Sequence, residues 1–275
     1  MHGVPLIQTY DHLYLSPHFD DAVLSCGGQI ERYASAGQSI LVVTITGGDP
    51  PDEPVSETVR ALHQRWAESG GAAEAMVAQR RAEDHAALAV LRAGALHLSF
   101  LDCIYRCGPE AGVALYPGPA DMFGPPNPAD AATVDALAET LRALPPAGRV
   151  YAPLGVGGHV DHLTTRGAAE RVFAELAYYE DYPYTMRPGA LAEVLPPAAR
   201  GEWAAETVWL TAGALAAKIA AVAAYKSQLS SFFTGPDDLA RKLREDGLRV
   251  MADAAAGGEF APGWAVGAER LWRPV

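Results

Sequence analysis

Short apolar runs rich in β-branched residues alternate with segments of helical periodicity through the first two thirds of the chain. Runs at 12–16 and 39–46 flank a segment at 21–36 whose apolar residues recur at helical spacing. The alternation continues with predicted helices near 75–92, 130–143 and 161–176 and predicted strands near 95–101 and 149–153. Units of this kind bury their apolar faces in a parallel sheet covered by helices. We therefore predict an α/β fold that is Rossmann-like, with a mostly parallel sheet and helices on both faces.

The chain of 275 residues is long enough for one large α/β domain, and it shows no internal repeat. We predict a single domain over 1–275, with a core at about 10–184 and a C-terminal extension at about 185–275. Beyond residue 184 the alternation loosens, and the clearest element is an Ala-rich helix at about 211–227. Gly and Pro are concentrated at 47–55 and 107–129, which predicts surface loops after strands.

The excess of acidic over basic residues limits the kinds of partner that the chain can bind. Lys and Arg number 21 against 33 Asp and Glu, a formal net charge of −12, which argues against nucleic acid. The N-terminus lacks a basic leader, and no window reaches the roughly 18 uninterrupted apolar residues of a membrane span. The three cysteines, Cys26, Cys103 and Cys107, do not resemble a disulfide framework. We expect a cytoplasmic protein with reduced thiols and no membrane span.

Two motifs rich in histidine and aspartate follow predicted strands. The first is SPHFDD at 16–21, and the second is GGHVDH at 157–162. Ligands of parallel α/β sheets bind at the carboxyl ends of the strands, so the two motifs are expected to face each other across a crevice. Imidazole and carboxylate are good zinc ligands. We predict that His18, Asp21 and His162 form a three-ligand zinc site with an open position for water, as in catalytic sites.

Each motif also has a plainer interpretation. Asp20 or Asp21 is a favoured helix N-cap, and an isolated His-x-x-His pair is mostly coincidental. The occurrence of both motifs, each between a strand and a helix, favours the metal site.

The two motifs resemble those of the PIG-L or LmbE-like zinc de-N-acetylases, which read approximately His-Pro-Asp-Asp-Glu and His-x-x-His. Four further segments are similar to this family: RRAED at 80–84, LDCIYR at 101–106, YEDYPY at 179–184 and YKSQ at 225–228. The resemblance therefore extends over most of the chain. It implies a deacetylase that acts on a small N-acylated sugar.

The resemblance also implies a role for each residue of the motifs. His18, Asp21 and His162 become the zinc ligands and Asp20 the general base. His159 becomes the group that stabilises the oxyanion, as a protonated imidazole, or protonates the departing amine. These roles agree with general chemistry, because zinc lowers the pKa of bound water toward about 7 and a neighbouring carboxylate can then take its proton.

The chain departs from the family pattern at two positions. Phe19 stands where the family usually has Pro, and Ala22 stands where it usually has Glu. Neither position binds the metal in the family, so the resemblance implies that the chemistry is kept. The missing Glu bears on the surroundings of the metal and on the type of substrate.

Several polar residues near predicted strand ends are candidates for substrate contact: Arg81, Asp102, Tyr105 and Arg106. The alternative is a solvated surface, because a charge run such as 80–84 usually marks an exposed helix face. Asp49 and Asp181 are candidates for supporting the metal ligands from behind. A turn and a polar strand end are their plainer interpretations.

We predict a zinc-dependent hydrolase that removes an acyl group, most simply acetyl, from the amide nitrogen of an amino sugar or related small glycoconjugate. Fe²⁺ or another divalent ion is an alternative to Zn²⁺. The alternative functions are an inactive metal- or carbohydrate-binding protein of the same fold, a metal-dependent phosphoesterase and a nucleotide-binding module. The additional carboxylate of Asp20 argues against an inactive binding protein. The small number of potential metal ligands argues against a phosphoesterase, which commonly uses two metals. No Gly-x-Gly-x-x-Gly follows a strand, which argues against a nucleotide-binding module. The oligomeric state is left open, a homo-oligomer included.

Overall fold

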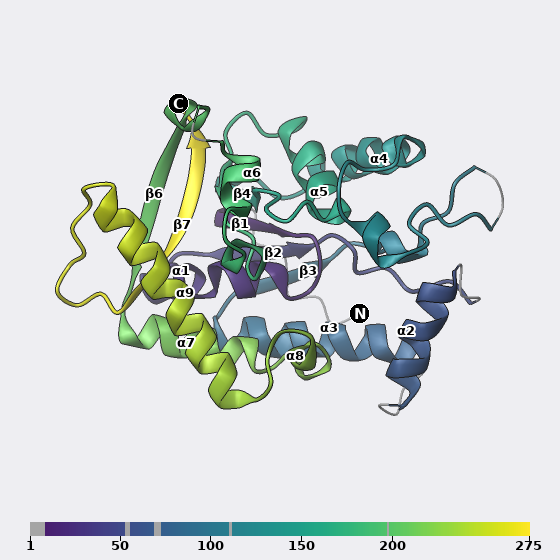
Figure 1. Cartoon of the computed structure of the whole chain (residues 1–275), viewed down its shortest axis with the longest axis horizontal. Helices are drawn as coiled ribbons and strands as arrows, with labels where there is room; N and C mark the ends of the chain where they lie inside the picture. The colour runs from purple at the N-terminus through teal and green to yellow at the C-terminus, as the bar shows by residue number, and fades with distance from the viewer. Residues whose placement is uncertain (1–8, 53–55, 69–72, 110–111, 197) are drawn as a thin grey trace.

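A seven-stranded sheet, in the order β3-β2-β1-β4-β5-β7-β6, runs through the middle of the protein (Figure 1). The computed structural model describes residues 9–52, 56–68, 73–109, 112–196 and 198–275, and the sheet belongs to these. Strands β1 to β5 pair in parallel, whereas β7 is antiparallel to both β5 and β6. The predicted α/β fold with a mostly parallel sheet is therefore confirmed. The strands are β1 (Tyr10–Ser16), β2 (Ile40–Thr44), β3 (Gly94–His97), β4 (Ala147–Pro153), β5 (Ala177–Tyr179), β6 (Trp203–Leu210) and β7 (Gly267–Pro274).

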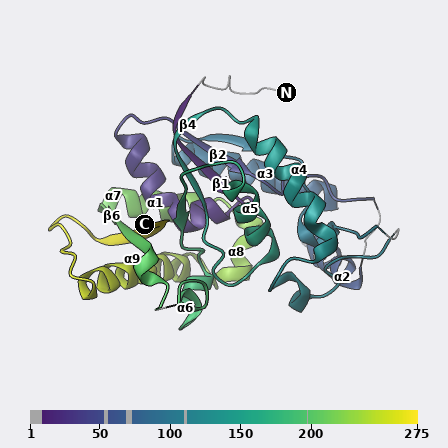
Figure 2. The same ribbon diagram turned by 90° about the horizontal axis from the view of Figure 1, so that it is seen from above.

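Helices cover both faces of this sheet (Figures 1 and 2). Helices α1, α3, α7 and α9 lie on one face, and α4 and α5 lie on the other. The helices are α1 (Asp21–Ser35), α2 (Glu57–Glu68), α3 (Ala73–Val90), α4 (Ala131–Arg142), α5 (Val160–Glu170), α6 (Ala190–Val194), α7 (Ala212–Val222), α8 (Lys226–Phe232) and α9 (Pro236–Ala256).

Strand β1 shows how the sequence divides the core into two layers. Successive side chains of a strand point to opposite faces of the sheet. Leu13 and Leu15 therefore enter the apolar cluster under α4 and α5, while Tyr14 enters the cluster under α1, α3 and α7. All three side chains are fully buried, as expected for a central strand covered on both faces.

The chain changes direction across the sheet between β1 and β4. From β1 the chain continues to β2 on one side, and from β4 it continues to β5 on the other, although β1 and β4 are paired neighbours. Such a switch point leaves a crevice at the carboxyl ends of the two strands. Both histidine motifs follow these strands directly.

The structure corrects several predicted boundaries. The strand predicted at 95–101 ends at His97, and the helix predicted at 161–176 ends at Glu170. The helix predicted at 211–227 is two helices, α7 and α8, separated at residues 223–225. Helix α2 and strands β6 and β7 had no predicted counterpart, whereas β5 ends just before Asp181, which was interpreted as a polar strand end. The region beyond 184 supplies two strands of the same sheet, and β7 lies between β5 and β6.

A buried ion pair joins α7 to β7 and α1. Lys218 Nζ lies 2.7 Å from Glu269 Oε1, and both side chains are 3% exposed. Glu269 also accepts hydrogen bonds from the backbone N–H groups of Gly28 and Gln29, at 2.9 and 2.8 Å. A Cβ atom on Gly28 would lie 2.6 Å from Leu210 Cδ1. Gly28 in α1 therefore permits the close approach of β6 and β7.

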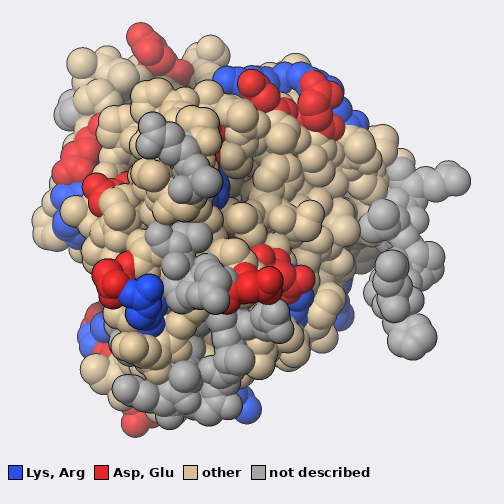
Figure 3. All heavy atoms as spheres, turned by 90° about the vertical axis from the view of Figure 1, so that its right-hand side faces the viewer, with Lys and Arg blue, Asp and Glu red and all other residues tan. Residues whose placement is uncertain are grey.

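Figure 3 shows the end of the molecule formed by α2 and the loop that follows β3. Most of this face is tan, and the acidic and basic atoms form small separate groups. Within the described ranges, no helix is both long enough and apolar enough to span a membrane.

Candidate metal centre and active site

The loop after β1 is shaped by Ser16. Ser16 Oγ donates a hydrogen bond to the carbonyl oxygen of His18 at 2.6 Å and accepts one from the backbone N–H of Ala22 at 3.0 Å. The backbone N–H of His18 in turn donates to Asp21 Oδ2 at 2.8 Å. These bonds close the turn between strand and helix and hold the His18 and Asp21 side chains together.

The loop after β4 brings a second histidine to the same place. His18 Nδ1 lies 2.9 Å from Asp21 Oδ2, and His162 Nε2 lies 3.3 Å from the same oxygen. One donor atom from each of the three residues lies within 4.8 Å of the other two. The fold thus brings together the three side chains that the sequence predicted as metal ligands, from loops far apart in the chain.

The buried imidazole of His162 is suited to a metal. Its Nε2 atom makes no hydrogen bond among the described residues and lies 3.3 Å from the Asp21 carboxylate, although the side chain is only 1% exposed. Its Nδ1 atom lies 2.7 Å from Asp181 Oδ1, so in the neutral ring Nδ1 carries the proton and Nε2 offers its lone pair. A divalent cation at Nε2 would replace the proton that the ring otherwise holds there and would also be bound by the Asp21 carboxylate. Two imidazoles and a carboxylate are a donor set that fits such an ion.

The two residues predicted to support the metal ligands occupy different environments. Asp181 is fully buried, and its second oxygen accepts hydrogen bonds from the backbone N–H groups of Gly155 and Val156, both at 2.8 Å. The carboxylate therefore fixes both the turn after β4 and the tautomer of a histidine. Asp49 is 68% exposed and forms an ion pair with Arg81 at 2.8 Å. Among the described residues, Asp49 forms no ion pair with His18 or His162.

Asp161 supports His18 in the way that Asp181 supports His162. His18 Nε2 lies 3.1 Å from Asp161 Oδ2, which leaves Nδ1 of His18 for a metal. Asp161 is held by the backbone N–H of Cys103 at 3.0 Å and by the guanidinium of Arg106. Arg106 is also paired with Asp130, with Nε and Oδ2 3.3 Å apart. Arg106, a candidate for substrate contact, is thus buried between two carboxylates. No role was predicted for Asp161 from the sequence, although it stands between the two histidines of its motif.

Two other groups of potential ligands are present among the described residues: His18, His159 and Asp161, which shares His18 with the first group, and Asp102, Cys103 and Asp161, which shares no residue with it. Both depend on Asp161, whose oxygens are already engaged by Arg106, Cys103 and His18. Burial also raises the pKa of the Cys103 thiol far above its ordinary value, which keeps the sulfur protonated. The set of His18, Asp21 and His162 therefore fits a divalent metal best.

Buried carboxylates give this cluster a strong affinity for cations. Burial opposes the charged form of His162, but Asp21 and Asp181 outweigh it and raise the pKa of His162 to about 9. Burial likewise opposes ionisation of Asp21, yet His162 and His18 hold the pKa of Asp21 well below its usual range. A site that holds protons so firmly also attracts a metal ion, which would take their place on the imidazoles.

Asp20 lies next to the donor set without belonging to it. Its side chain is 4% exposed, and Arg80 Nη2 lies 4.0 Å from its Oδ1. Burial and the neighbouring Asp21 raise the pKa of Asp20 to about 6. A carboxyl group with a pKa near neutrality is suited to accept and return a proton at pH 7.

His159 caps α5 and faces the same site. Its Nδ1 atom accepts a hydrogen bond from the backbone N–H of Asp161 at 3.2 Å, so the proton of the neutral ring is on Nε2. Burial and the nearby His18 lower the pKa of His159 to about 3, which favours the neutral ring over the protonated form. The ring centroids of His18 and His159 are 4.9 Å apart. His159 is therefore suited to donate a hydrogen bond from Nε2 to an oxyanion.

Helix α3 connects the loop that carries Asp20 to α8. Asp84 accepts a hydrogen bond from the Tyr225 hydroxyl at 2.7 Å, and this hydroxyl also lies 3.0 Å from the carbonyl oxygen of Phe19. Glu83 accepts hydrogen bonds from the backbone N–H and the hydroxyl of Ser227, at 3.1 and 2.6 Å. Glu83 and Asp84 are 8% and 0% exposed. The interpretation of 80–84 as a solvated charge run is therefore wrong for these residues.

The remaining candidates for substrate contact differ in accessibility. Asp102 retains 20% exposure of its side chain, and its Oδ2 lies 3.7 Å from His18 Nε2, at the border of the donor set. Tyr105 is buried, with its hydroxyl 2.8 Å from His63 Nε2. Arg81 donates a hydrogen bond from Nε to the carbonyl oxygen of Gly47 at 3.1 Å. Asp102 is thus the most directly placed of the four for contact with a bound molecule.

Both departures from the family pattern are packing positions. The Phe19 ring is 2% exposed and packs edge-on against His97, with centroids 5.1 Å apart. The Arg80 guanidinium lies over the Phe19 ring, 5.2 Å from its centroid. Ala22 is fully buried in the apolar cluster beneath α1. The two residues therefore support the loop without reaching the donor atoms.

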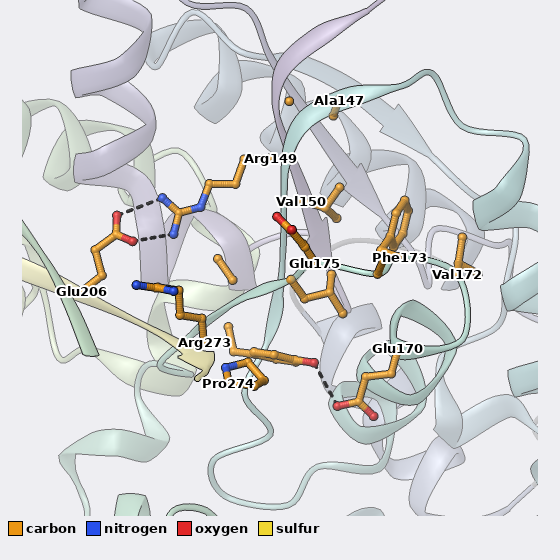
Figure 4. Close-up of a pocket in the computed structure, with 15 residues that line it drawn as sticks. Ala147, Arg149, Val150, Glu170, Val172, Phe173, Glu175, Glu206, Arg273 and Pro274 are labelled. Atoms are coloured by element: carbon orange, nitrogen blue, oxygen red, sulfur yellow. Dashed lines mark hydrogen bonds and ion pairs between the residues drawn. The ribbon is translucent and has the colours of Figure 1, made fainter. Parts of the chain in front are cut away.

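A cavity of about 860 Å³ lies at the opposite edge of the sheet, at the start of β4 (Figure 4). Arg149 and Glu206, which both line it, are joined in a bidentate ion pair with distances of 2.9 and 2.6 Å. None of the predicted site residues lines this cavity. The chemistry of the donor set, and not the size of a cavity, therefore locates the active site.

The fold and the donor set at its switch point define a class, the metal-dependent hydrolases built on a Rossmann-like sheet. The chain belongs to the GlcNAc-PI de-N-acetylase (PIG-L) family, whose model matches residues 13–173. The predicted family is thus confirmed.

Individual relatives resemble the chain over nearly its whole length. The 2'-N-acetylparomamine deacetylase of Streptomyces fradiae is 28% identical over 279 residues, which cover 96% of this chain and 89% of the relative. The crystal structure of a zinc-inhibited form of teicoplanin deacetylase has a TM-score of 0.76 at 28% identity and covers 96% and 97% of the two chains. The deacetylase of the A40926 pseudoaglycone has a TM-score of 0.67 at 28% identity and covers 97% of each chain. These similarities confirm the prediction of an N-deacetylase with a divalent metal.

Proposed function

We propose that this protein is a zinc-dependent deacetylase that removes an acetyl group from the nitrogen of an amino sugar in a small glycoconjugate. The observation that carries the proposal is the convergence of His18, Asp21 and His162 on one point, with the Asp20 carboxyl group beside them. These three residues would hold the metal ion, and the additional carboxylate of Asp20 provides a base.

Zn²⁺ at this position would supply Lewis acidity, lowering the pKa of water and polarising the amide carbonyl. The chain supplies the proton transfers. Asp20 takes a proton from the attacking water at its carboxylate, which its pKa of about 6 permits at neutral pH. The Nε2–H group of His159 donates a hydrogen bond to the oxyanion that develops on the former carbonyl oxygen. Asp20 then returns its proton to the departing nitrogen, which leaves as an amine.

The substrate class follows from the named relatives. One relative is named as a 2'-N-acetylparomamine deacetylase, and two solved structures are named as a teicoplanin deacetylase and an A40926 pseudoaglycone deacetylase. The family itself is named for de-N-acetylation of GlcNAc-PI, which supports an N-acetylated amino sugar as the substrate. The exposed carboxylate of Asp102, at the border of the donor set, is suited to bind sugar hydroxyl groups.

The first test is the metal content of the wild type and of His162→Ala, purified without a histidine tag and without added metal. We expect about one zinc per wild-type chain and little in the variant, because removal of one of three ligands weakens the site. Elemental analysis measures both. Equal, near-zero metal in both proteins after zinc is restored would overturn the proposal.

The second test is turnover by the zinc-loaded enzyme. The assay measures release of free amine from N-acetylglucosamine, 2'-N-acetylparomamine and N-acetylglucosaminyl glycopeptide, with a model phosphoester as the negative control. Asp20→Asn should keep its metal and lose about 10²–10⁴-fold in kcat, the contribution of a positioned general base. Wild-type turnover by Asp20→Asn would refute the role of Asp20, and turnover of only the phosphoester would refute the reaction.

Three broader features belong to the same proposal. We regard residues 1–275 as a single domain, which the continuity of the sheet from β1 to β7 supports. A cytoplasmic location is supported by three free cysteines, two of them buried. Size-exclusion chromatography of the purified protein would establish whether it forms a homo-oligomer.

A further inference from the structure

Arg106 lies at the centre of a buried series of polar contacts that begins at His18. The Nε2–H group of His18 donates to Asp161 Oδ2 at 3.1 Å, and the Arg106 guanidinium donates to the other oxygen of Asp161. On its far side, Arg106 Nε lies 3.3 Å from Asp130 Oδ2, and the Tyr116 hydroxyl donates to the same oxygen at 2.8 Å. The four residues behind His18 are each at most 6% exposed. A predicted metal ligand is therefore connected through the interior to Tyr116, in the segment before α4.

The segment before α4 holds the far side of Arg106 in place. Asp130 directly precedes α4, and its Oδ1 atom accepts a hydrogen bond from the Thr133 hydroxyl at 2.6 Å. The Tyr116 hydroxyl accepts a hydrogen bond from the backbone N–H of Asn127 at 3.0 Å. The Arg106 guanidinium lies over the Tyr116 ring, 5.4 Å from its centroid. Two residues that contact Arg106 are thus themselves fixed by hydrogen bonds, so the guanidinium has a defined position.

The shape of a guanidinium suits Arg106 to this place. A guanidinium is planar and always charged, and its N–H donors point in several directions, so it can bind two carboxylates at once. Nη2 of Arg106 bonds to Asp161, and Nε faces Asp130. The second oxygen of Asp161 also accepts a hydrogen bond from the backbone N–H of Cys103 at 3.0 Å. Both oxygens of Asp161 are therefore engaged, and the one that faces His18 cannot turn away without breaking these bonds.

We propose that Arg106 and Asp130 are positioning residues that set the metal affinity of His18. The inference rests on the proposed function and extends it to two residues that act through Asp161. A carboxylate behind a metal-binding histidine fixes the orientation and the tautomer of the ring, and the groups that hold this carboxylate share in the effect. With its proton on Nε2, His18 offers the lone pair of Nδ1 to the metal. Arg106 therefore serves the reaction from the interior and not by contact with the substrate.

The first measurement is the zinc affinity of Arg106→Lys and Asp130→Asn, by competition with a chromophoric chelator at pH 7. Lysine keeps the positive charge but cannot bind two carboxylates with the geometry of a guanidinium, and asparagine removes the charge that faces Arg106. We expect the zinc affinity to fall by about 10-fold or more in each variant. Arg149→Lys is the matched control, because Arg149 is also bonded to a carboxylate, that of Glu206, but lines the cavity at the opposite edge of the sheet. The zinc affinity of this control should change by less than about 2-fold.

Tyr116→Phe tests the same contacts with a smaller change, which keeps the test valid if a charge variant folds poorly. It removes one hydroxyl group and keeps the ring beside Arg106. We expect a loss of zinc affinity in the same direction, of about 2–10-fold, because Asp130 loses one of its hydrogen bonds. Urea denaturation of the metal-free variants measures the free energy of unfolding separately. A purely structural role would lower this free energy and leave the zinc affinity of the folded protein unchanged.

Nuclear magnetic resonance of the zinc-loaded protein with isotope-labelled histidine reports directly on the ring of His18. The Nε2–H proton of His18 should exchange slowly with water in the wild type and faster in Arg106→Lys, because the carboxylate that accepts it is held less firmly. Wild-type zinc affinity and wild-type exchange in all three variants would overturn the inference, as would an equal loss in Arg149→Lys, and deacetylation by the wild type would be unaffected. Weakened zinc binding in the variants, with a zinc-loaded wild type that hydrolyses no N-acetyl sugar, would support the positioning role and overturn the proposed function.

Discussion

Replacement of Asp181 by Asn tests whether a carboxylate sets the metal affinity of His162. The two oxygens of Asp181 accept three hydrogen bonds, one from His162 Nδ1 and two from the backbone N–H groups of Gly155 and Val156. An amide has only one oxygen. In Asp181→Asn that oxygen can remain with the two backbone groups, but the NH₂ group then faces His162 Nδ1 and donates to it. The proton of the imidazole moves to Nε2, the atom that should bind the metal.

The expected magnitude follows from this change of tautomer. Metal binding at Nε2 would require the His162 proton to move back to Nδ1. There the Nδ1–H group would face the N–H of the introduced amide, so one buried donor would lack an acceptor. An unsatisfied buried donor costs about 1–3 kcal/mol. Loss of a carboxylate behind a metal-binding histidine typically weakens metal affinity by about 10–100-fold, or about 1.4–2.8 kcal/mol. The cost of the unsatisfied donor therefore agrees with the free energy that corresponds to this loss of metal affinity. We therefore expect Asp181→Asn to bind zinc 10–100-fold more weakly than the wild type.

Competition with a chromophoric chelator at pH 7 measures the zinc affinity of each protein. Asp49→Asn is the matched control, because the same substitution is made at an exposed residue that pairs with Arg81. Its affinity should change by less than about 2-fold. Wild-type affinity in Asp181→Asn, or an equal loss in both variants, would refute the reasoning.

Two further predictions concern stability. In the metal-free protein, burial and Asp21 raise the pKa of Asp20 to about 6, so the folded state binds a proton more tightly than the unfolded chain. The contribution of Asp20 to the stability of the metal-free protein should therefore fall as pH rises from about 4 through 6, and Asp20→Asn should be more stable than the wild type by about 1–3 kcal/mol at pH 7 but not at pH 4. Urea denaturation at both pH values measures the difference, and a pH-independent difference would contradict it. Lys218→Met leaves Glu269 buried without its cation and should lower the free energy of unfolding by about 3–5 kcal/mol. Lys242→Met changes a partly exposed lysine and should lower the free energy of unfolding by less than about 1 kcal/mol. Equal effects of the two lysine variants in urea denaturation would show that the buried pair is not the cause.

The parallel part of the fold and the metal donor set could be predicted because their signals are local. Strands β1 and β4 each end in a run of buried and mostly apolar residues, and each is followed within a few residues by its histidine motif. The rule that ligands bind at the carboxyl ends of parallel strands then brings His18, Asp21 and His162 together.

The supporting residues were harder to predict because their roles depend on which side of a helix faces the sheet. Arg80 and Asp84 share a helical stripe with Ala87, Leu88 and Leu91, at spacings of three or four residues. Ala87, Leu88 and Leu91 are buried, so polar residues on the same stripe also point inward. A polar residue within an apolar stripe therefore predicts a buried polar side chain. This pattern was overlooked because the high charge of 80–84 favoured an exposed helix face.

The C-terminal strands could not be predicted from periodicity. Strand β6 lies at the edge of the sheet and pairs only with β7 among the described strands. The 21-residue helix α9 lies between these two strands in the sequence. Their place in the sheet follows from tertiary pairing, which a single sequence does not encode as a local pattern.

The position of β7 also determines when the native sheet can close. Glu269 bonds to Gly28 and Gln29, which are 241 and 240 residues away in the chain. Contacts between such distant residues form slowly, since a long loop must be closed before they contribute. Until β7 arrives, β5 and β6 each present an unpaired edge, and unpaired edges promote pairing between chains. The last strand to enter the sheet therefore determines how long a folding intermediate remains exposed to aggregation.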